Sequence, residues 1–167
     1  MNLIKFQKSW KQDFMEISKF IEPSINGIFA TIVHVGSTSI DGAIAKPIID
    51  IDLVIEDLGQ KTEVISRLAS IGYVHRGDLG IEGREAFFQP TNLPEHHLYL
   101  VHRDAKAYLD HIDFQSALQA DSKLVQEYND LKKSLEHLLL IDRQLYTDGK
   151  TDFILKVLNE YRLRGRN

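Results

Sequence analysis

The sequence predicts an α/β fold followed by a helical tail, and two observations support this prediction. Runs of β-branched and apolar residues, typical of strands, alternate with segments of helical periodicity up to residue 103. From Asp104 onward the strand-like alternation disappears and only the helical period continues. We therefore expect a small sheet with flanking helices over residues 1–103 and a helical bundle over residues 104–167, packed against each other in a single domain.

The composition limits the classes of protein to consider. The chain has 167 residues, 43% of them hydrophobic, which is sufficient for one buried core. Its net charge of −4 argues against general nucleic-acid binding. It contains no cysteine, so disulfides and thiolate metal sites are excluded. We see neither an apolar run of the roughly 18 residues a membrane span needs nor a signal peptide, and we expect a cytoplasmic protein.

The first hundred residues divide into alternating helices and strands. Residues 7–22 place Trp10 and other apolar side chains at helical spacing, and Pro23 ends this helix. A second helix is expected over residues 57–71, with Gly72 as its stop. Strands are expected over residues 29–35, 48–55, 73–75, 84–89 and 96–101.

The tail is expected to contain helices over roughly residues 104–119, 121–140 and 148–163. In the middle helix, Lys132 and Lys133 lie opposite or beside the stripe of leucine and tyrosine side chains. One of these lysines could reach a ligand bound by the core. The alternative is that both belong to a solvated helix face.

The stretch from His34 to Ile55 contains the residues with the clearest chemistry. Gly36 and Ser37 follow the first strand directly, and a glycine in a tight turn lets backbone N–H groups approach an anion. Asp50 and Asp52 alternate onto one face of the next strand, which is otherwise apolar. Two such carboxylates need a cation, a proton or hydrogen-bond donors, and Mg²⁺ with substrate phosphates meets that need. The stretch therefore predicts a site for Mg²⁺ and a nucleoside triphosphate.

Other polar residues near this stretch are candidates for phosphate binding, and each has a structural alternative. Thr38 and Ser39 could donate to a phosphate or cap a short helix. Lys46 precedes the second strand and Arg84 begins a later one. Either residue could contact a phosphate. The alternative for Lys46 is an ordinary surface lysine, and the alternative for Arg84 is a surface ion pair.

These motifs resemble those of the nucleotidyltransferase (DNA polymerase β-like) superfamily, in which Gly-Ser is followed after about a dozen residues by Asp-x-Asp on the next strand. Over almost the whole chain the sequence looks like the GrpB family of small cytosolic bacterial proteins, through the segments HVGSTSIDG, AKPIIDIDLVI, GREAFF, HHLYLV, YNDLKKSL and YTDGKTDFI. The resemblance implies a small mixed β-sheet of nucleotidyltransferase type. It also implies Mg²⁺-dependent transfer of a nucleoside monophosphate from a nucleoside triphosphate to a small-molecule or protein acceptor.

The sequence departs from the superfamily pattern because the third carboxylate is missing from the later strand. That strand begins with His96 and His97, which alternate onto opposite faces. His97 or Glu95 could complete the site, with histidine as a general base, and Glu85 lies on the preceding strand. Two alternatives stay open: a non-catalytic nucleotide- or metabolite-binding module, and a metal-dependent phosphohydrolase with His96 and His97 as ligands.

Overall fold

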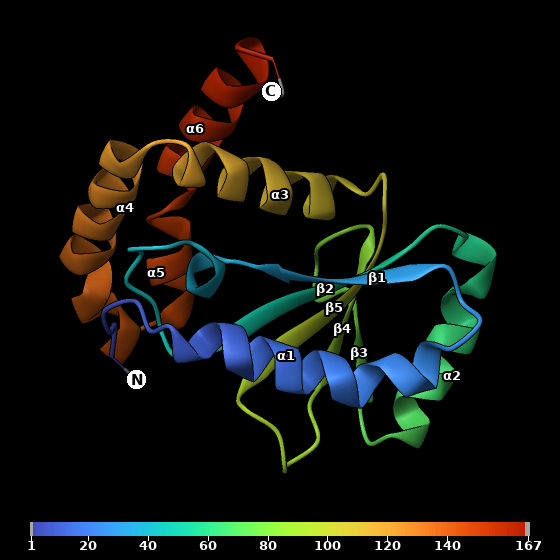
Figure 1. The fold of residues 1–167 in the computed structure, drawn as a ribbon. Coiled ribbons are helices and arrows are strands. Elements are labelled where there is room, and N and C mark those ends of the chain that lie inside the picture. Colours follow the sequence, from blue (N-terminus) through green and yellow to red (C-terminus); the bar gives the residue numbers. More distant parts are fainter. Residues whose placement is uncertain (1, 166–167) are drawn as a thin grey trace.

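The computed structural model describes residues 2–165, which contain a five-stranded sheet with helices on both faces (Figure 1). The strands follow the order β1-β2-β5-β4-β3. Strand β2 pairs with β5 in parallel, and the other neighbours are antiparallel, so the predicted mixed sheet is confirmed. The strand bounds are β1 (Ala30–Val35), β2 (Ile49–Ile55), β3 (Val74–Gly77), β4 (Arg84–Phe88) and β5 (His96–His102).

One face of the sheet is covered by helices α1 (Ser9–Ile21) and α2 (Lys61–Ser70). Alternate residues of β2 point to this side, and Ile51 and Leu53 are fully buried in the apolar core. The core includes Trp10. This face contains the apolar packing that stabilises the sheet.

The opposite side carries the helical tail, which consists of α3 (Lys106–Gln119), α4 (Ser122–Leu135), α5 (Arg143–Asp148) and α6 (Thr151–Leu163). Its helices bury a second apolar cluster that includes Leu118, Tyr128 and Val157. In Figure 1, α3 lies across the sheet from α1. The predicted C-terminal helical bundle is confirmed.

The tail differs from the prediction in two places. The helix expected over residues 121–140 ends at Leu135 and continues as a 3₁₀ helix, η4 (Glu136–Leu140). Helix α5 was not predicted, because six residues are too short for a periodic pattern to be visible. The side chain of Asp142 caps α5 by accepting a hydrogen bond from the backbone N–H of Gln144 at 2.7 Å. No helix among residues 2–165 is long and apolar enough to cross a membrane.

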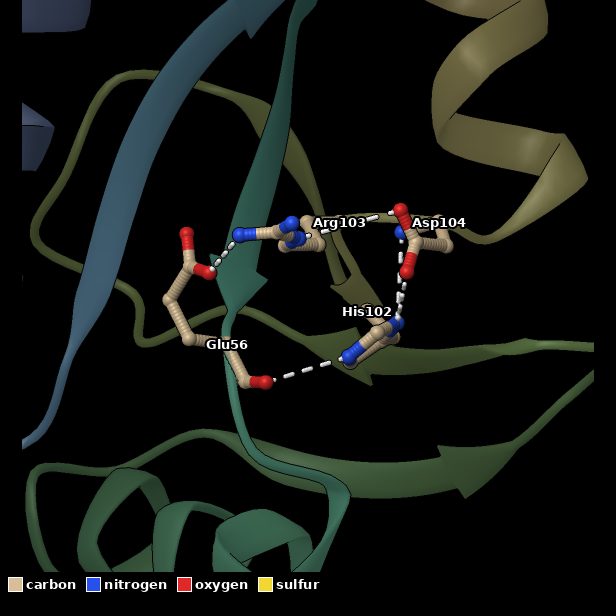
Figure 2. A network of polar contacts seen from close by, with 4 residues as sticks. All are labelled: Glu56, His102, Arg103 and Asp104. Carbon is tan, nitrogen blue, oxygen red and sulfur yellow. Dashed lines mark hydrogen bonds and ion pairs between the residues drawn. The ribbon is translucent and has the colours of Figure 1, made fainter.

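Strands β2 and β5 end together at a network of polar contacts that leads into α3 (Figure 2). Nη1 of Arg103 lies 2.7 Å from Oε2 of Glu56, and Nε2 of His102 donates to the backbone carbonyl of Glu56 at 3.1 Å. The backbone N–H of Asp104 donates to Nδ1 of His102 at 3.2 Å. The two hydrogen bonds of His102 with the backbone hold the turn from β5 into α3, whereas the Arg103–Glu56 ion pair is exposed to water.

Candidate functional site

Asp50 and Asp52 lie on the face of β2 that is turned toward the helical tail. Their neighbours in the sheet are His97 and Tyr99 of β5, in parallel register. The Asp50 side chain is 33% exposed, whereas that of Asp52 is completely buried. The expected placement of both aspartates on one face is therefore found, but their access to solvent differs.

Each aspartate is held by a histidine. Nδ1 of His97 donates to Oδ1 of Asp50 at 2.9 Å, and Nδ1 of His111, on α3, donates to Oδ2 of Asp52 at 2.7 Å. Burial opposes protonation of His111, but its hydrogen bond to Asp52 and the charge of that carboxylate raise its pKa above the ordinary value. The second oxygen of Asp52, Oδ1, is buried and has no hydrogen-bond partner among residues 2–165.

Gly36 is required because the turn after β1 passes directly beside Asp50. Its φ of +73° lies in the left-handed region, and a Cβ at this position would approach Oδ2 of Asp50 to 2.5 Å. The 3₁₀ turn η2 (Ser37–Ser39) follows, and the Ser39 hydroxyl donates to the carbonyl of Gly36 at 2.6 Å. The structure thus places the Gly-Ser turn directly against Asp50.

A cavity of about 300 Å³ opens beside Asp50, and cationic side chains surround it. The predicted residues Gly36, Ser37, Thr38, Lys46, Arg84, His97 and Lys132 all line this cavity, together with Arg143 and Lys150. We call it the cationic cavity. Ser39 is not among the lining residues; its hydroxyl accepts a hydrogen bond from Nε2 of Gln115 at 2.7 Å.

Lys132 reaches the cationic cavity from α4 and is only 1% exposed. Its Nζ donates to the hydroxyl of Ser37 at 3.2 Å and to the carbonyl of Ile44. Burial, together with the charge of Lys150, lowers the pKa of Lys132 to about 7. The solvated-face alternative is therefore wrong for Lys132, although the next residue, Lys133, is exposed.

Lys150 and Lys46 both approach the ring of Tyr146, with Nζ 4.4 Å and 5.6 Å from its centroid. Burial and the neighbouring charge of Lys46 lower the pKa of Lys150 to about 8. Burial and the charge of Arg143 lower the pKa of Lys46. Because these cations disfavour one another's charge, an anion bound between them would relieve the repulsion.

The other candidates for completing the site lie elsewhere. His96 is buried on the opposite face, where its Nδ1 donates to the Pro94 carbonyl and its Nε2 accepts from the Tyr73 hydroxyl, each at 2.7 Å. Glu85 pairs with Lys61 and His75 on that same face, and Glu95 is exposed outside the cavity. Within residues 2–165, no three His, Cys, Asp or Glu side chains are arranged to hold a metal ion together.

Sequence reasoning missed His111, Arg143 and Lys150. Lys150 lies in the segment YTDGKTDFI, which resembles a GrpB-family motif, and this resemblance was the available signal that Lys150 belongs to the site. His111 gave no comparable signal, because its role depends on where α3 crosses the sheet. Arg143 lies on α5, the short helix that was not predicted.

The mixed sheet with its helical tail places the chain in the nucleotidyltransferase fold class. The Cid1 poly(U) polymerase, in a crystal structure bound to MgATP, aligns with a TM-score of 0.53 and 13% identity over 78% of this chain and 45% of that one, a likeness of fold alone. The chain belongs to the GrpB family, since the family model described as GrpB protein matches residues 1–160.

Individual relatives agree with this assignment over nearly the full chain. The glutamate-rich protein GrpB of Alkalihalophilus pseudofirmus is 33% identical over 163 residues, which cover 95% of this chain and 94% of that protein. The crystal structure of the conserved protein GrpB from Enterococcus faecalis aligns with a TM-score of 0.83 at 25% identity, covering 95% of this chain and 96% of that one.

Proposed function

We propose that the cationic cavity binds a nucleoside triphosphate with Mg²⁺, and that the protein transfers the nucleoside monophosphate to an acceptor hydroxyl on a small molecule or protein. The observation that carries this proposal is the convergence of cationic side chains, the Gly36-Ser37 turn and Asp50 on one cavity. Asp52 is buried beside Asp50 on the same face of β2 and does not itself line the cavity. A triphosphate is the small anion whose several charges such a cavity would match.

The phosphates would lie between Lys46, Lys132, Lys150 and Arg143, and the backbone at Gly36 can approach them because it carries no side chain. The lysines then gain the counter-charge that they lack in the free protein, where their pKa values are lowered. Phosphate binding therefore depends on residues from both the core and the tail.

Asp50 and Asp52 fit a bound Mg²⁺, which is usually held by one or two carboxylates together with substrate phosphates. The unpartnered Oδ1 of Asp52 is an oxygen that such an ion or its water would satisfy. Bound Mg²⁺ would neutralise charge on the phosphates. His97 holds the Asp50 carboxylate through Nδ1, and its other nitrogen is the candidate to accept a proton from the acceptor hydroxyl.

The test is isothermal titration with ATP, GTP, CTP and UTP, each with and without Mg²⁺. We expect at least one triphosphate to bind in a Mg²⁺-dependent manner, and we expect the double variant Asp50→Asn/Asp52→Asn to lose that dependence. Asp41→Asn, an exposed aspartate in the preceding loop, is the matched control and should bind as the wild type does. Binding of no triphosphate, or unchanged binding by the double variant, would exclude the proposal.

A second candidate function is nucleotide or metabolite binding without transfer. It is favoured by the residues of β5 beside the aspartates, which are His97 and Tyr99 where the superfamily has a carboxylate. It predicts metal-dependent binding with no turnover, and release of pyrophosphate in the presence of any acceptor would eliminate it. The phosphohydrolase alternative gains no support, because His96 and His97 point to opposite faces and cannot share an ion.

A further inference from the structure

A second cavity of about 210 Å³ adjoins the cationic cavity and has no role in the function proposed so far. The two cavities have part of their walls in common: Gly36, Ser37, Asp50, His111 and Lys150 line both. A ligand atom beside Asp50 therefore has access to either space. The shared wall includes the Gly-Ser turn and the partly exposed Asp50, which are the centre of the proposed reaction.

The remaining wall of the second cavity is largely apolar and aromatic, unlike that of the cationic cavity. It is formed by Ile40, Phe114, Tyr128 and Ile154, with Gln115 and Asp110 as polar residues. The ring of Phe114 is fixed by an edge-to-face contact with Tyr128, with 5.2 Å between centroids. The charge of Asp110 is balanced by Arg162, whose Nη2 lies 2.6 Å from it. We call this space the aromatic cavity.

We infer that the aromatic cavity binds the nucleoside of the nucleotide whose phosphates occupy the cationic cavity, an inference that rests on the proposed function. A nucleoside triphosphate joins a multiply charged anion to a planar heterocycle with apolar faces. Pockets that bind such heterocycles are lined mainly by apolar and aromatic side chains with a few fixed polar groups. The two cavities offer these two chemistries on either side of a shared wall at Asp50.

Gln115 supplies a fixed polar group in the aromatic cavity. Its Nε2 donates to the carbonyl of His34 at 3.0 Å and to the hydroxyl of Ser39 at 2.7 Å, so the side-chain amide is held in one orientation. Ser39, a candidate for phosphate contact or for capping a short helix, instead holds the side chain of Gln115 in the aromatic cavity. A polar group that is oriented before the ligand arrives loses little entropy on binding.

The experiment separates the two halves of the ligand. Calorimetry compares the tightest-binding of ATP, GTP, CTP and UTP with inorganic tripolyphosphate, all with Mg²⁺, on the full chain and on Ile154→Trp, which fills the aromatic cavity. We expect the wild type to bind the nucleotide about tenfold or more tightly than tripolyphosphate. In Ile154→Trp, nucleotide affinity should fall to about that of tripolyphosphate, while tripolyphosphate affinity should be unchanged.

Leu155→Trp is the matched control, because this neighbouring residue on α6 is exposed and lines neither cavity; it should change neither affinity. Equal affinity of the wild type for nucleotide and tripolyphosphate would overturn the inference while leaving phosphate binding in the cationic cavity intact. Binding of neither ligand would reject the proposed function itself. If circular dichroism shows Ile154→Trp unfolded, Ile154→Ala replaces it. We then expect about a fivefold loss for the nucleotide alone, and an equal loss for both ligands would overturn the inference.

Discussion

The two faces of the central sheet bury their side chains in different ways, and strand β2 contributes to both: its aspartates point to one face, which we call the acidic face, and its isoleucine and leucine side chains point to the other. On one face, Ile51 and Leu53 of β2 pack against α1 and α2 through apolar contacts. On the other, Asp50 and Asp52 are each held by one histidine, and the histidines come from β5 and α3. Apolar contact accepts many partners, whereas a buried carboxylate needs a donor at one position and in one direction. The apolar face therefore supplies stability, and the acidic face supplies a site whose geometry depends on distant segments.

The largest effect is expected on the apolar face. Leu53 is fully buried, and Leu53→Ala should lower the free energy of unfolding by about 2 to 5 kcal/mol through lost burial and an unfilled cavity. Urea denaturation measures this loss, and the fraction that stays folded should bind nucleotide with unchanged affinity. Leu58→Ala, at an exposed apolar residue, is the control and should leave the midpoint in place. A loss below about 1 kcal/mol for Leu53→Ala would show that this face is not the main source of stability.

The next effect concerns Lys132 on the acidic side and depends on pH. Burial lowers its pKa from 10.5 to about 7, so between these values the unfolded chain binds a proton that the folded protein does not. The free energy of unfolding should therefore rise with pH across this window, relative to Lys132→Met, by up to roughly 3 kcal/mol. Denaturation of both proteins at pH 7, 8.5 and 10 measures the difference.

Lys133→Met provides the matched control for this pH dependence, because Lys133 is exposed on the same helix. Its stability should run parallel to that of the wild type at every pH. If the difference between wild type and Lys132→Met does not change with pH, Lys132 is not titrating in the folded protein as its burial requires. Burial of Lys132 would then make no pH-dependent contribution to the free energy of unfolding.

The third prediction tests the close approach of the Gly-Ser turn to Asp50. Gly36 and Gly80 both have positive φ, but a Cβ at Gly80 meets nothing within 4 Å. Gly80→Ala should therefore lower the free energy of unfolding by about 1 kcal/mol through backbone strain. Gly36→Ala should lower it by about 2 kcal/mol, because the added Cβ also displaces the Asp50 carboxylate. Only Gly36→Ala should weaken Mg²⁺-dependent nucleotide binding. Equal effects of the two substitutions on stability and binding would mean that the turn does not constrain Asp50.

The contrast between the faces also explains what the sequence could predict. Periodicity of two along β2 placed Asp50 and Asp52 together and the isoleucines opposite, and this required no knowledge of the rest of the fold. Helical periodicity likewise located α1, and it identified the apolar stripe of α4 through Tyr128. Local patterns were sufficient wherever the property depended on neighbours along the chain.

Residues that act across the fold could not be found in this way. The side chain of His111 meets Asp52 only because the turn after β5 directs α3 across the sheet. Arg143 and Lys150 enter the cationic cavity because the chain turns back after η4, and no periodicity encodes that turn. Lys132 was assigned a possible solvated position because a lysine in a helix is usually exposed. Its burial depends on acceptors at Ser37 and Ile44, far away in the sequence.

The smallest effect is expected where polar contacts are exposed, at the network that leads into α3 (Figure 2). The ion pair between Arg103 and Glu56 is accessible to water. We therefore expect the urea midpoint and the nucleotide affinity of Arg103→Ala to equal those of the wild type within experimental error. His102→Ala should lower the midpoint measurably, because this half-buried side chain bonds the backbone of Glu56 and of Asp104. If Arg103→Ala instead weakened nucleotide binding, the exposed ion pair would have to orient α3, and with it the histidine on Asp52. The acidic face would then depend on surface charge as well as on buried donors, and raising the ionic strength should reproduce the effect in the wild type.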